Sequence, residues 1–207
     1  MIIKKRDLEV VNDKPKVLIT GISGWIAQFC AIELIKNGYF VRGSLRTMNR
    51  KDEVLNALSS VVDIKNNIEF CELDLMKDDG WDLAMSDIKY VMHIASPFVL
   101  AEPKNENDII EPAREGTLRA LRAAKKAGVK RLVLTSSVVA MLAHLRKGTC
   151  NDQSWTDLND SKIYPYQKSK TIAERVAWDF INAQTDENAL ELSVVNPGAV
   201  LGPTLSD

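Results

Sequence analysis

Short apolar runs alternate along the chain with longer stretches in which apolar side chains recur every three or four positions. The runs have the length of strands, and the longer stretches have the period of amphipathic helices. The runs lie at residues 16–20, 39–41, 68–73, 90–95, 131–134 and 192–195. The helical patterns lie at residues 25–38, 51–60, 107–126 and 165–180. This alternation predicts an α/β protein with a Rossmann-type, doubly wound parallel sheet of six strands, whose functional loops follow the strands' carboxyl ends.

The composition is that of a globular protein. The chain has 207 residues, of which 45% are hydrophobic and 27% are charged, so it can bury a sizeable core. Residues 1–15 are charged and lack a period, and we predict an N-terminal extension there, followed by a dinucleotide-binding domain over residues 16–207. A net charge of −1 gives no reason to expect nucleic acid or an anionic membrane as a partner.

Signals for export or for a metal are not found in the sequence. The basic N-terminus leads into acidic residues, and no apolar stretch reaches the roughly 18 residues of a membrane span. Cys30, Cys71 and Cys150 are odd in number and have no C-x-x-C spacing, which argues against a disulfide framework and against a thiol metal site. We therefore expect a cytoplasmic protein with reduced thiols and no metal.

A glycine-rich turn separates the first apolar run from the first helical pattern. Gly21, Gly24 and Ala27 fall at G-x-x-G-x-x-A, a variant of the dinucleotide fingerprint G-x-G-x-x-G. Gly21 can adopt the backbone angles of a tight turn, and Gly24 has no Cβ to keep a pyrophosphate from the free N–H groups of the helix start. The two glycines alone are equally typical of a plain turn, but the strand, helix and strand around them favour a dinucleotide site.

The second run ends in a basic segment. An acidic side chain at this place in a dinucleotide-binding unit takes the ribose 2′-OH of NAD, whereas a basic one takes the 2′-phosphate of NADP. No acidic residue occurs here before Asp52, while Arg46 is followed by Arg50 and Lys51. The segment favours NADP over NAD. The alternative is that these are solvated charges at the start of a surface helix.

The ends of the third and fourth runs supply further candidates. Asp74 and Leu75 are placed to hold the adenine amino group and ring face, or to form an ordinary loop. The small residues 95–97 would let a cofactor lie across the strand ends. His93, inside a nearly continuous apolar run, fits a core histidine with satisfied hydrogen bonds better than a catalytic one.

Tyr166 and Lys170 form the candidate catalytic pair. They are four positions apart, so on a helix they share one face. A phenol has a pKa of about 10, and a nearby ammonium should lower it and suit the group to acid–base work on a carbonyl or an alcohol. Tyr164 and Lys168 repeat the spacing, but Pro165 suits the first turn of a helix and leaves Tyr164 at its cap, which favours the second pair.

Three segments together resemble the extended branch of the short-chain dehydrogenase/reductase superfamily. They read T-G-I-S-G-W-I-A at residues 20–27, L-T-S-S at 134–137 and Y-Q-K-S-K-T-I-A-E at 166–174. The resemblance covers about residues 16–204. It is strongest to the dihydroflavonol-reductase-like group, which includes plant cinnamoyl-CoA reductases and bacterial or fungal carbonyl and aldehyde reductases.

The resemblance implies the role of each residue. Ser137 would hydrogen-bond the substrate oxygen, Tyr166 would donate the proton as hydride is transferred, and Lys170 would hold the nicotinamide ribose and depress the tyrosine pKa. The implied reaction is NADP-dependent reduction of a small ketone or aldehyde to an alcohol. With the segment after the last run closing over the nicotinamide, the candidate NADPH site comprises Thr20, Gly21, Ser23, Gly24, Trp25, Ile26, Arg46, Asp74, Leu75, Ala95, Ser96, Pro97, Tyr166, Lys170, Pro197, Gly198 and Val200.

Two other functions stay open at this point. A sugar-nucleotide epimerase or dehydratase uses the same three catalytic residue types but keeps its cofactor bound and often prefers NAD, which Arg46 without a nearby acid argues against. A non-catalytic dinucleotide-binding module is the other. Family members continue well beyond the segment that matches residues 196–203, so we expect the substrate domain to be largely absent, which would leave the chain inactive. Both a monomer and a homodimer are compatible with the sequence.

Overall fold

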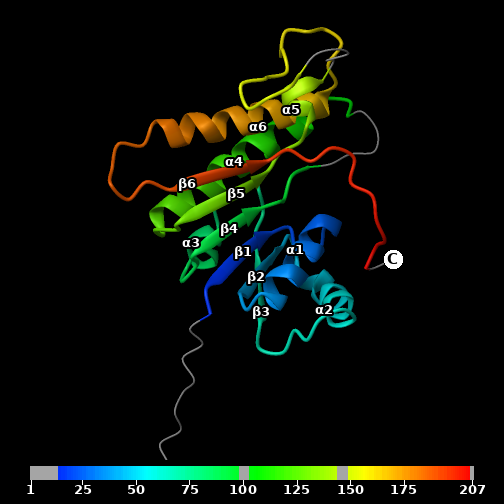
Figure 1. Ribbon diagram of the computed structural model, residues 1–207, viewed down its shortest axis with the longest axis vertical. Coiled ribbons are helices and arrows are strands. Elements are labelled where there is room, and N and C mark those ends of the chain that lie inside the picture. The colour runs from blue at the N-terminus through cyan, green and yellow to red at the C-terminus, as the bar shows by residue number, and fades with distance from the viewer. Residues whose placement is uncertain (1–13, 98–102, 144–148, 206–207) are drawn as a thin grey trace, which may run out of the picture.

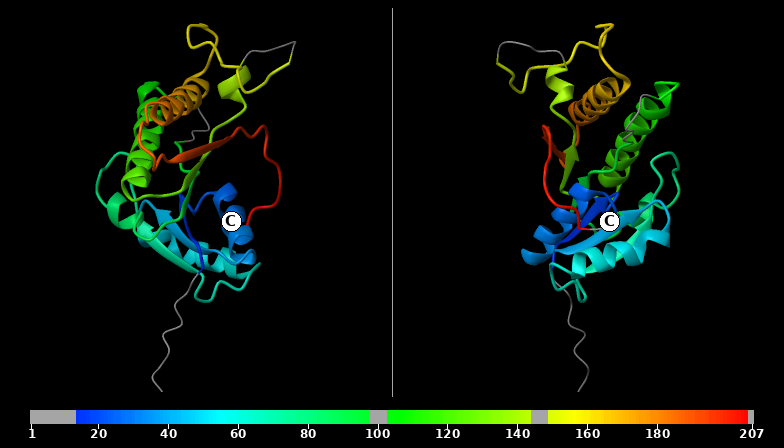
Figure 2. Two further views of the ribbon diagram at one scale, coloured as in Figure 1. Left: turned by 60° about the vertical axis from the view of Figure 1, so that its left-hand side comes forward. Right: turned by 90° about the vertical axis from the view of Figure 1, so that its right-hand side faces the viewer.

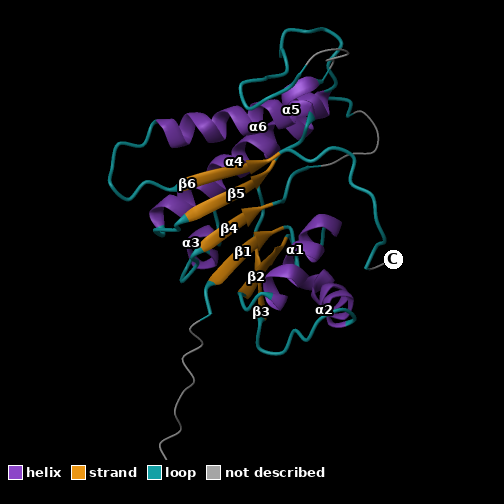
Figure 3. Ribbon diagram, in the orientation of Figure 1, coloured by secondary structure: helices purple, strands orange, loops and turns teal. Residues whose placement is uncertain are grey.

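Six parallel strands form one sheet in the computed structural model, which describes residues 14–97, 103–143 and 149–205. Their order is β3-β2-β1-β4-β5-β6, so the chain winds outward in both directions from the centre (Figures 1 and 3). The predicted doubly wound sheet is confirmed. The strands are β1 (Lys16–Thr20), β2 (Phe40–Leu45), β3 (Ile68–Glu72), β4 (Tyr90–His93), β5 (Arg131–Thr135) and β6 (Glu191–Val195).

Four long helices connect these strands at the predicted places. Three shorter elements were not predicted, because a single turn is too short to show a period. The long helices are α1 (Trp25–Lys36), α2 (Lys51–Ser59), α4 (Asn107–Lys126) and α6 (Pro165–Asn182). The short ones are the 3-10 turn η1 (Met48–Arg50), α3 (Trp81–Ala84) and α5 (Val139–Leu142).

The helices cover both faces of the sheet (Figure 2). Consecutive residues of β1 point to opposite faces, and each starts a separate apolar core. Ile19 packs with α1 and α2, whereas Leu18 packs with α3, α4 and α6. The right-handed connections of a parallel sheet produce this division, because the winding direction reverses between β1 and β4. The reversal opens a crevice above the carboxyl ends of these two strands.

The side chain of Thr20 joins the strands at this reversal. Its Oγ1 atom accepts hydrogen bonds from the backbone N–H groups of Ile94 and Ala95, each at 3.0 Å, and lies 3.0 Å from Nδ1 of His93. The two N–H groups use both acceptor positions of the hydroxyl oxygen, so its proton is donated to His93. The His93 ring is therefore neutral and carries its own proton on Nε2.

Most of the predicted N-terminal extension, residues 1–13, lies outside the described residues. In the described ranges no helix has the length and apolarity needed to cross a membrane. Cys30, Cys71 and Cys150 are free cysteines in this structure.

Replacing the Thr20 hydroxyl should weaken the whole fold. In Thr20→Val the N–H groups of Ile94 and Ala95 lose their acceptor, and we expect the free energy of unfolding to fall by about 2 kcal/mol or more. Thr20→Ser keeps the hydroxyl and is the matched control. Urea unfolding measures both variants, and equal losses in the two would show that the hydroxyl is not what joins the strands.

Candidate functional site

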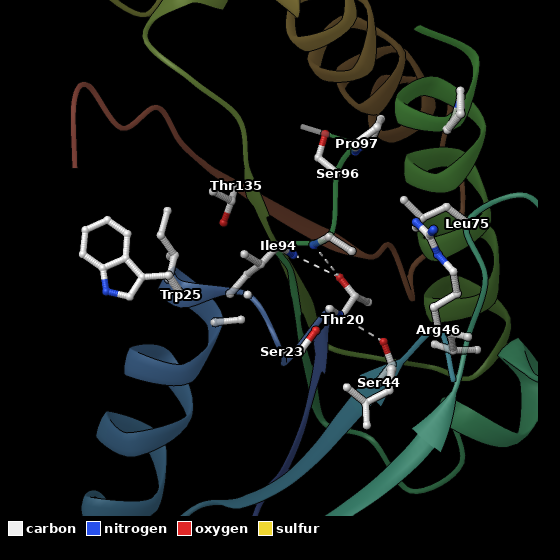
Figure 4. Close-up of a pocket in the computed structure, with 18 of the residues that line it drawn as sticks. Thr20, Ser23, Trp25, Ser44, Arg46, Leu75, Ile94, Ser96, Pro97 and Thr135 are labelled. Atoms are coloured by element: carbon white, nitrogen blue, oxygen red, sulfur yellow. Dashed lines mark hydrogen bonds between the residues drawn. The ribbon is translucent and has the colours of Figure 1, made fainter. Parts of the chain in front are cut away.

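A cleft of about 1310 Å³ lies over the carboxyl ends of the strands. It runs from the turn after β1 to the segment after β6, and Figure 4 shows side chains converging on it from both halves of the sheet. Every residue predicted for catalysis or for the cofactor lines it. These are Thr20, Gly21, Ser23, Gly24, Trp25, Ile26, Arg46, Asp74, Leu75, Ala95, Ser96, Pro97, Ser137, Tyr166, Lys170, Pro197, Gly198 and Val200.

The turn between β1 and α1 brings the backbone close to this cleft. Gly21 has φ of +67°, and a Cβ on it would lie 3.0 Å from Cβ of Ala95. Gly24 is the N-cap of α1, where no described side chain caps the first N–H groups and no acidic residue occupies the first turn. Uncapped N–H groups at the positive end of a helix attract an anion. The turn therefore fits the pyrophosphate of a dinucleotide.

β2 holds this turn in place through two residues to which the sequence reasoning gave no role. Ser44 Oγ accepts the N–H of Gly21 at 3.1 Å, and the Ser44 carbonyl accepts the N–H of Ile22 at 3.0 Å. A Cβ on Gly43 would lie 2.4 Å from Cδ1 of Ile22, so only glycine fits there without a shift. In the sequence, the two adjacent small residues near the end of the second apolar run are the feature that could have indicated this role.

The basic segment after β2 divides into three different environments. Arg46 is exposed and lines the cleft, and Figure 4 shows it among the lining side chains. Arg50 also lines the cleft but donates two hydrogen bonds to Glu53, at 2.8 and 2.5 Å. Lys51 lies over the ring of Phe70, 5.9 Å from its centre. The structure therefore singles out Arg46 among the three cations that the sequence grouped.

Helix α4 fixes the loop after β3. Arg119 donates a hydrogen bond from Nη1 to the carbonyl of Leu75 at 2.8 Å. Gly116 lets Leu75 pack against the helix, since a Cβ there would lie 2.8 Å from Cδ2 of Leu75. Asp74 accepts the N–H of Met76 at 2.9 Å through Oδ1. The candidate adenine contacts thus belong to a loop held by a neighbouring helix.

The start of α6 decides which tyrosine faces the cleft. Pro165 is the first helical residue, and the N–H of Tyr164 donates to Oε1 of Gln167 at 2.8 Å. Tyr164 is 56% exposed, and Lys168 pairs with Glu106 at 2.7 Å. Neither Tyr164 nor Lys168 lines the cleft, whereas Tyr166 and Lys170 both do.

The pKa values of this pair differ from the expectation. Burial raises the pKa of Tyr166, although a hydrogen bond with Ser137 acts in the opposite direction. The expected lowering by Lys170 is not found: the effect that opposes burial comes from Ser137. Burial also lowers the pKa of Lys170 to about 8, opposed by the charge of Glu174. The Lys170 ammonium donates to the carbonyl of Thr135 at 3.1 Å.

Ser136, beside the predicted catalytic serine, has a buried hydroxyl with no hydrogen-bond partner among the described residues. It also lines the cleft. A buried hydroxyl is costly to leave unpaired, so its position suits a polar group of a bound ligand. The L-T-S-S segment at residues 134–137 contains both serines, but the family resemblance gave a role only to Ser137.

The segment after β6 crosses from the edge of the sheet to α1 (Figure 1). Trp25 donates from Nε1 to the carbonyl of Pro203 at 2.7 Å, and the indole ring packs against Gly202. Leu205 packs against the core that contains Ile19. This connection holds Pro197 to Val200 along the border of the cleft.

A family model described as the NAD dependent epimerase/dehydratase family matches residues 17–206. The chain belongs to this family. Within it, the predicted likeness to dihydroflavonol-reductase-like proteins is confirmed by the relatives. Tetraketide alpha-pyrone reductase 1 of Arabidopsis thaliana is 33% identical over 200 residues, which cover 93% of this chain and 59% of that protein. Dihydroflavonol 4-reductase of the same plant is 30% identical over 204 residues, covering 95% and 52%.

Solved structures of the family lead to the same group. The yeast methylglyoxal/isovaleraldehyde reductase Gre2, complexed with NADPH, superposes with a TM-score of 0.79 at 31% identity. The match covers 91% of this chain and 59% of Gre2. The chain thus spans between about half and three fifths of the length of these family members.

His93 should make the fold sensitive to acid. Burial, followed by the charge of Lys170, lowers the pKa of His93 to about 3, whereas an unfolded chain protonates the ring near about 6.5. Because the unfolded chain then binds more protons, the contribution to stability is full above about pH 6.5 and is lost as the pH falls toward about 3. Urea unfolding measures this between about pH 6 and pH 4. As the pH falls, the free energy of unfolding of the wild type should decrease by up to about 1.4 kcal/mol per pH unit more than that of His93→Asn. Parallel curves would contradict the buried neutral ring.

Proposed function

We propose that this chain forms the NADP-binding and proton-donating part of a reductase that converts a ketone or aldehyde to an alcohol. The observation that carries the proposal is the convergence of Ser137, Tyr166 and Lys170 on one cleft with the uncapped start of α1. These are the hydroxyl, phenol and ammonium that proton transfer to a carbonyl requires.

The residues present fit NADPH along the whole cleft. The turn at Gly21 and Gly24 would hold the pyrophosphate, and Arg46 would pair with the 2′-phosphate. Asp74 and Leu75 would hold the adenine. At the other end, Lys170 would hold the nicotinamide ribose, while residues 95–97 and 197–200 would border the nicotinamide. The NADPH complex of Gre2, a relative at 31% identity, supports the choice of cofactor.

NADPH, when bound, supplies the hydride that the carbonyl carbon accepts. Ser137 donates a hydrogen bond that holds the carbonyl oxygen beside Tyr166, and the phenol transfers its proton to that oxygen, which completes the alcohol. Burial raises the pKa of Tyr166, so the phenol carries the proton it has to give at neutral pH. The ammonium of Lys170 stabilises the phenolate that remains.

The same residues admit a second reaction, which the family's description favours. An epimerase or dehydratase would oxidise and then reduce a sugar nucleotide with one tightly held cofactor. Purification separates the two: an epimerase retains a stoichiometric dinucleotide through gel filtration, whereas the proposed reductase releases and exchanges it.

Activity should depend on the phenol of Tyr166. With NADPH and a panel of aldehydes that includes methylglyoxal and isovaleraldehyde, loss of nicotinamide absorbance should exceed that of Tyr166→Phe by about 100-fold or more. NADPH fluorescence measures binding by the same variant, which should stay near the wild-type value. NADPH binding by the wild type without oxidation would reassign the chain as a cofactor-binding module.

Arg46 should set the preference between the two nicotinamide cofactors. Removing its guanidinium in Arg46→Ala should raise the Kd for NADPH by about tenfold or more, because a charge-assisted phosphate contact is lost, and should leave the Kd for NADH unchanged. Lys51→Ala is the matched control, since that cation lies over Phe70 and does not line the cleft. Equal weakening for both cofactors would place the 2′-phosphate elsewhere.

A further inference from the structure

Helix α6 carries a buried carboxylate that has no part in the reaction described above. Glu174 is 6% exposed and lies one helical turn after Lys170, on the same face of the helix. Acidic side chains are almost never fully buried unless a partner compensates their charge. The buried charge of Glu174 therefore requires a partner in the fold.

Asn196, at the end of β6, connects this carboxylate to the catalytic serine. Its Nδ2 atom donates to Oε2 of Glu174 at 2.7 Å and to the carbonyl of Ser137 at 3.2 Å. Both amide hydrogens are thereby used, which fixes the orientation of the side chain. The three residues tie α6 to the ends of β5 and β6, the elements that border the cleft.

Burial disfavours the charged form of Lys170, and a negative charge close by favours it. It is 7% exposed, and it donates a hydrogen bond to a neutral carbonyl, that of Thr135. Among the residues that the structure describes, the titratable groups around it are His93 from β4, which is neutral, Tyr166 from its own helix, and Glu174. Burial pulls the pKa of Lys170 down to about 8, and the charge of Glu174 pulls it upward.

We propose that Glu174 is a positioning residue, the buried counter-charge that keeps Lys170 protonated while Asn196 holds the carboxylate against the Ser137 end of β5. The catalytic meaning of this pair rests on the proposed reductase function. The charge coupling itself belongs to the folded chain and can be measured without cofactor or substrate.

The titration of Lys170 tests the coupling directly. Glu174→Gln removes the charge but keeps an oxygen that can accept the Asn196 hydrogen bond. In spectra of the full chain with ¹³C-labelled lysine, the Lys170 Cε signal, assigned with Lys170→Met, should titrate at a pH lower by about one unit or more in Glu174→Gln. The control Asp179→Asn makes the same charge change at an exposed position of α6 and should leave the midpoint unchanged. An unchanged midpoint in Glu174→Gln overturns the proposal.

A stability cycle keeps the proposal falsifiable if Glu174→Gln does not fold. In a Lys170→Met background the carboxylate has lost its counter-charge, so adding Glu174→Gln should raise the thermal midpoint. In the wild-type background the same substitution should lower it. A lower midpoint in both backgrounds would show that Glu174 acts without reference to Lys170.

Turnover supplies a third measurement that separates this inference from the proposed function. If the chain reduces aldehydes, the alkaline fall of kcat/KM should move to lower pH in Glu174→Gln, and Glu174→Asp should restore most of the wild-type profile. A general loss at every pH, with no displacement of the fall, would indicate a merely structural role. If the wild type reduces no carbonyl, the proposed function fails, while the lysine titration still decides this one.

Discussion

The hydroxyl of Thr20 is the contact on which the arrangement of the cleft depends. It joins β1 to the turn after β4 at the one place in this sheet where the direction of winding reverses. Ala95 is thereby held against Gly21, so the floor of the cleft is closed while its upper part opens between the diverging connections. The glycine turn and the uncapped start of α1 lie directly on this floor. The other residues predicted to contact a dinucleotide line the same cleft.

Features set by local rules could be predicted from the sequence. The strands and the long helices follow from hydrophobic periods that each segment carries by itself. The choice of Tyr166 over Tyr164 follows from the position of Pro165, because proline at the first helical residue fixes which tyrosine is inside the helix. His93 could be assigned to the core because an apolar strand leaves a histidine no water to contact.

Features set by contacts between distant segments could not be predicted. The pKa of Tyr166 moves upward because the fold buries the phenol, and the spacing of Tyr166 and Lys170 contains no information on burial. For the same reason the sequence could not distinguish Arg46 from Arg50, whose guanidinium donates two hydrogen bonds to Glu53. The bond between Asn196 and Glu174 spans 22 positions, and neither residue alone has a pattern that names its partner.

The indole of Trp25 links two parts of the fold that are far apart in the sequence. Its bond to Pro203 joins the outermost strand, through the segment that follows it, to the first helix of the opposite half of the sheet. The segment after β6 thus borders the cleft and ends against α1. The course of residues 197–200 along the border of the cleft is therefore anchored by one tryptophan on the opposite half of the sheet.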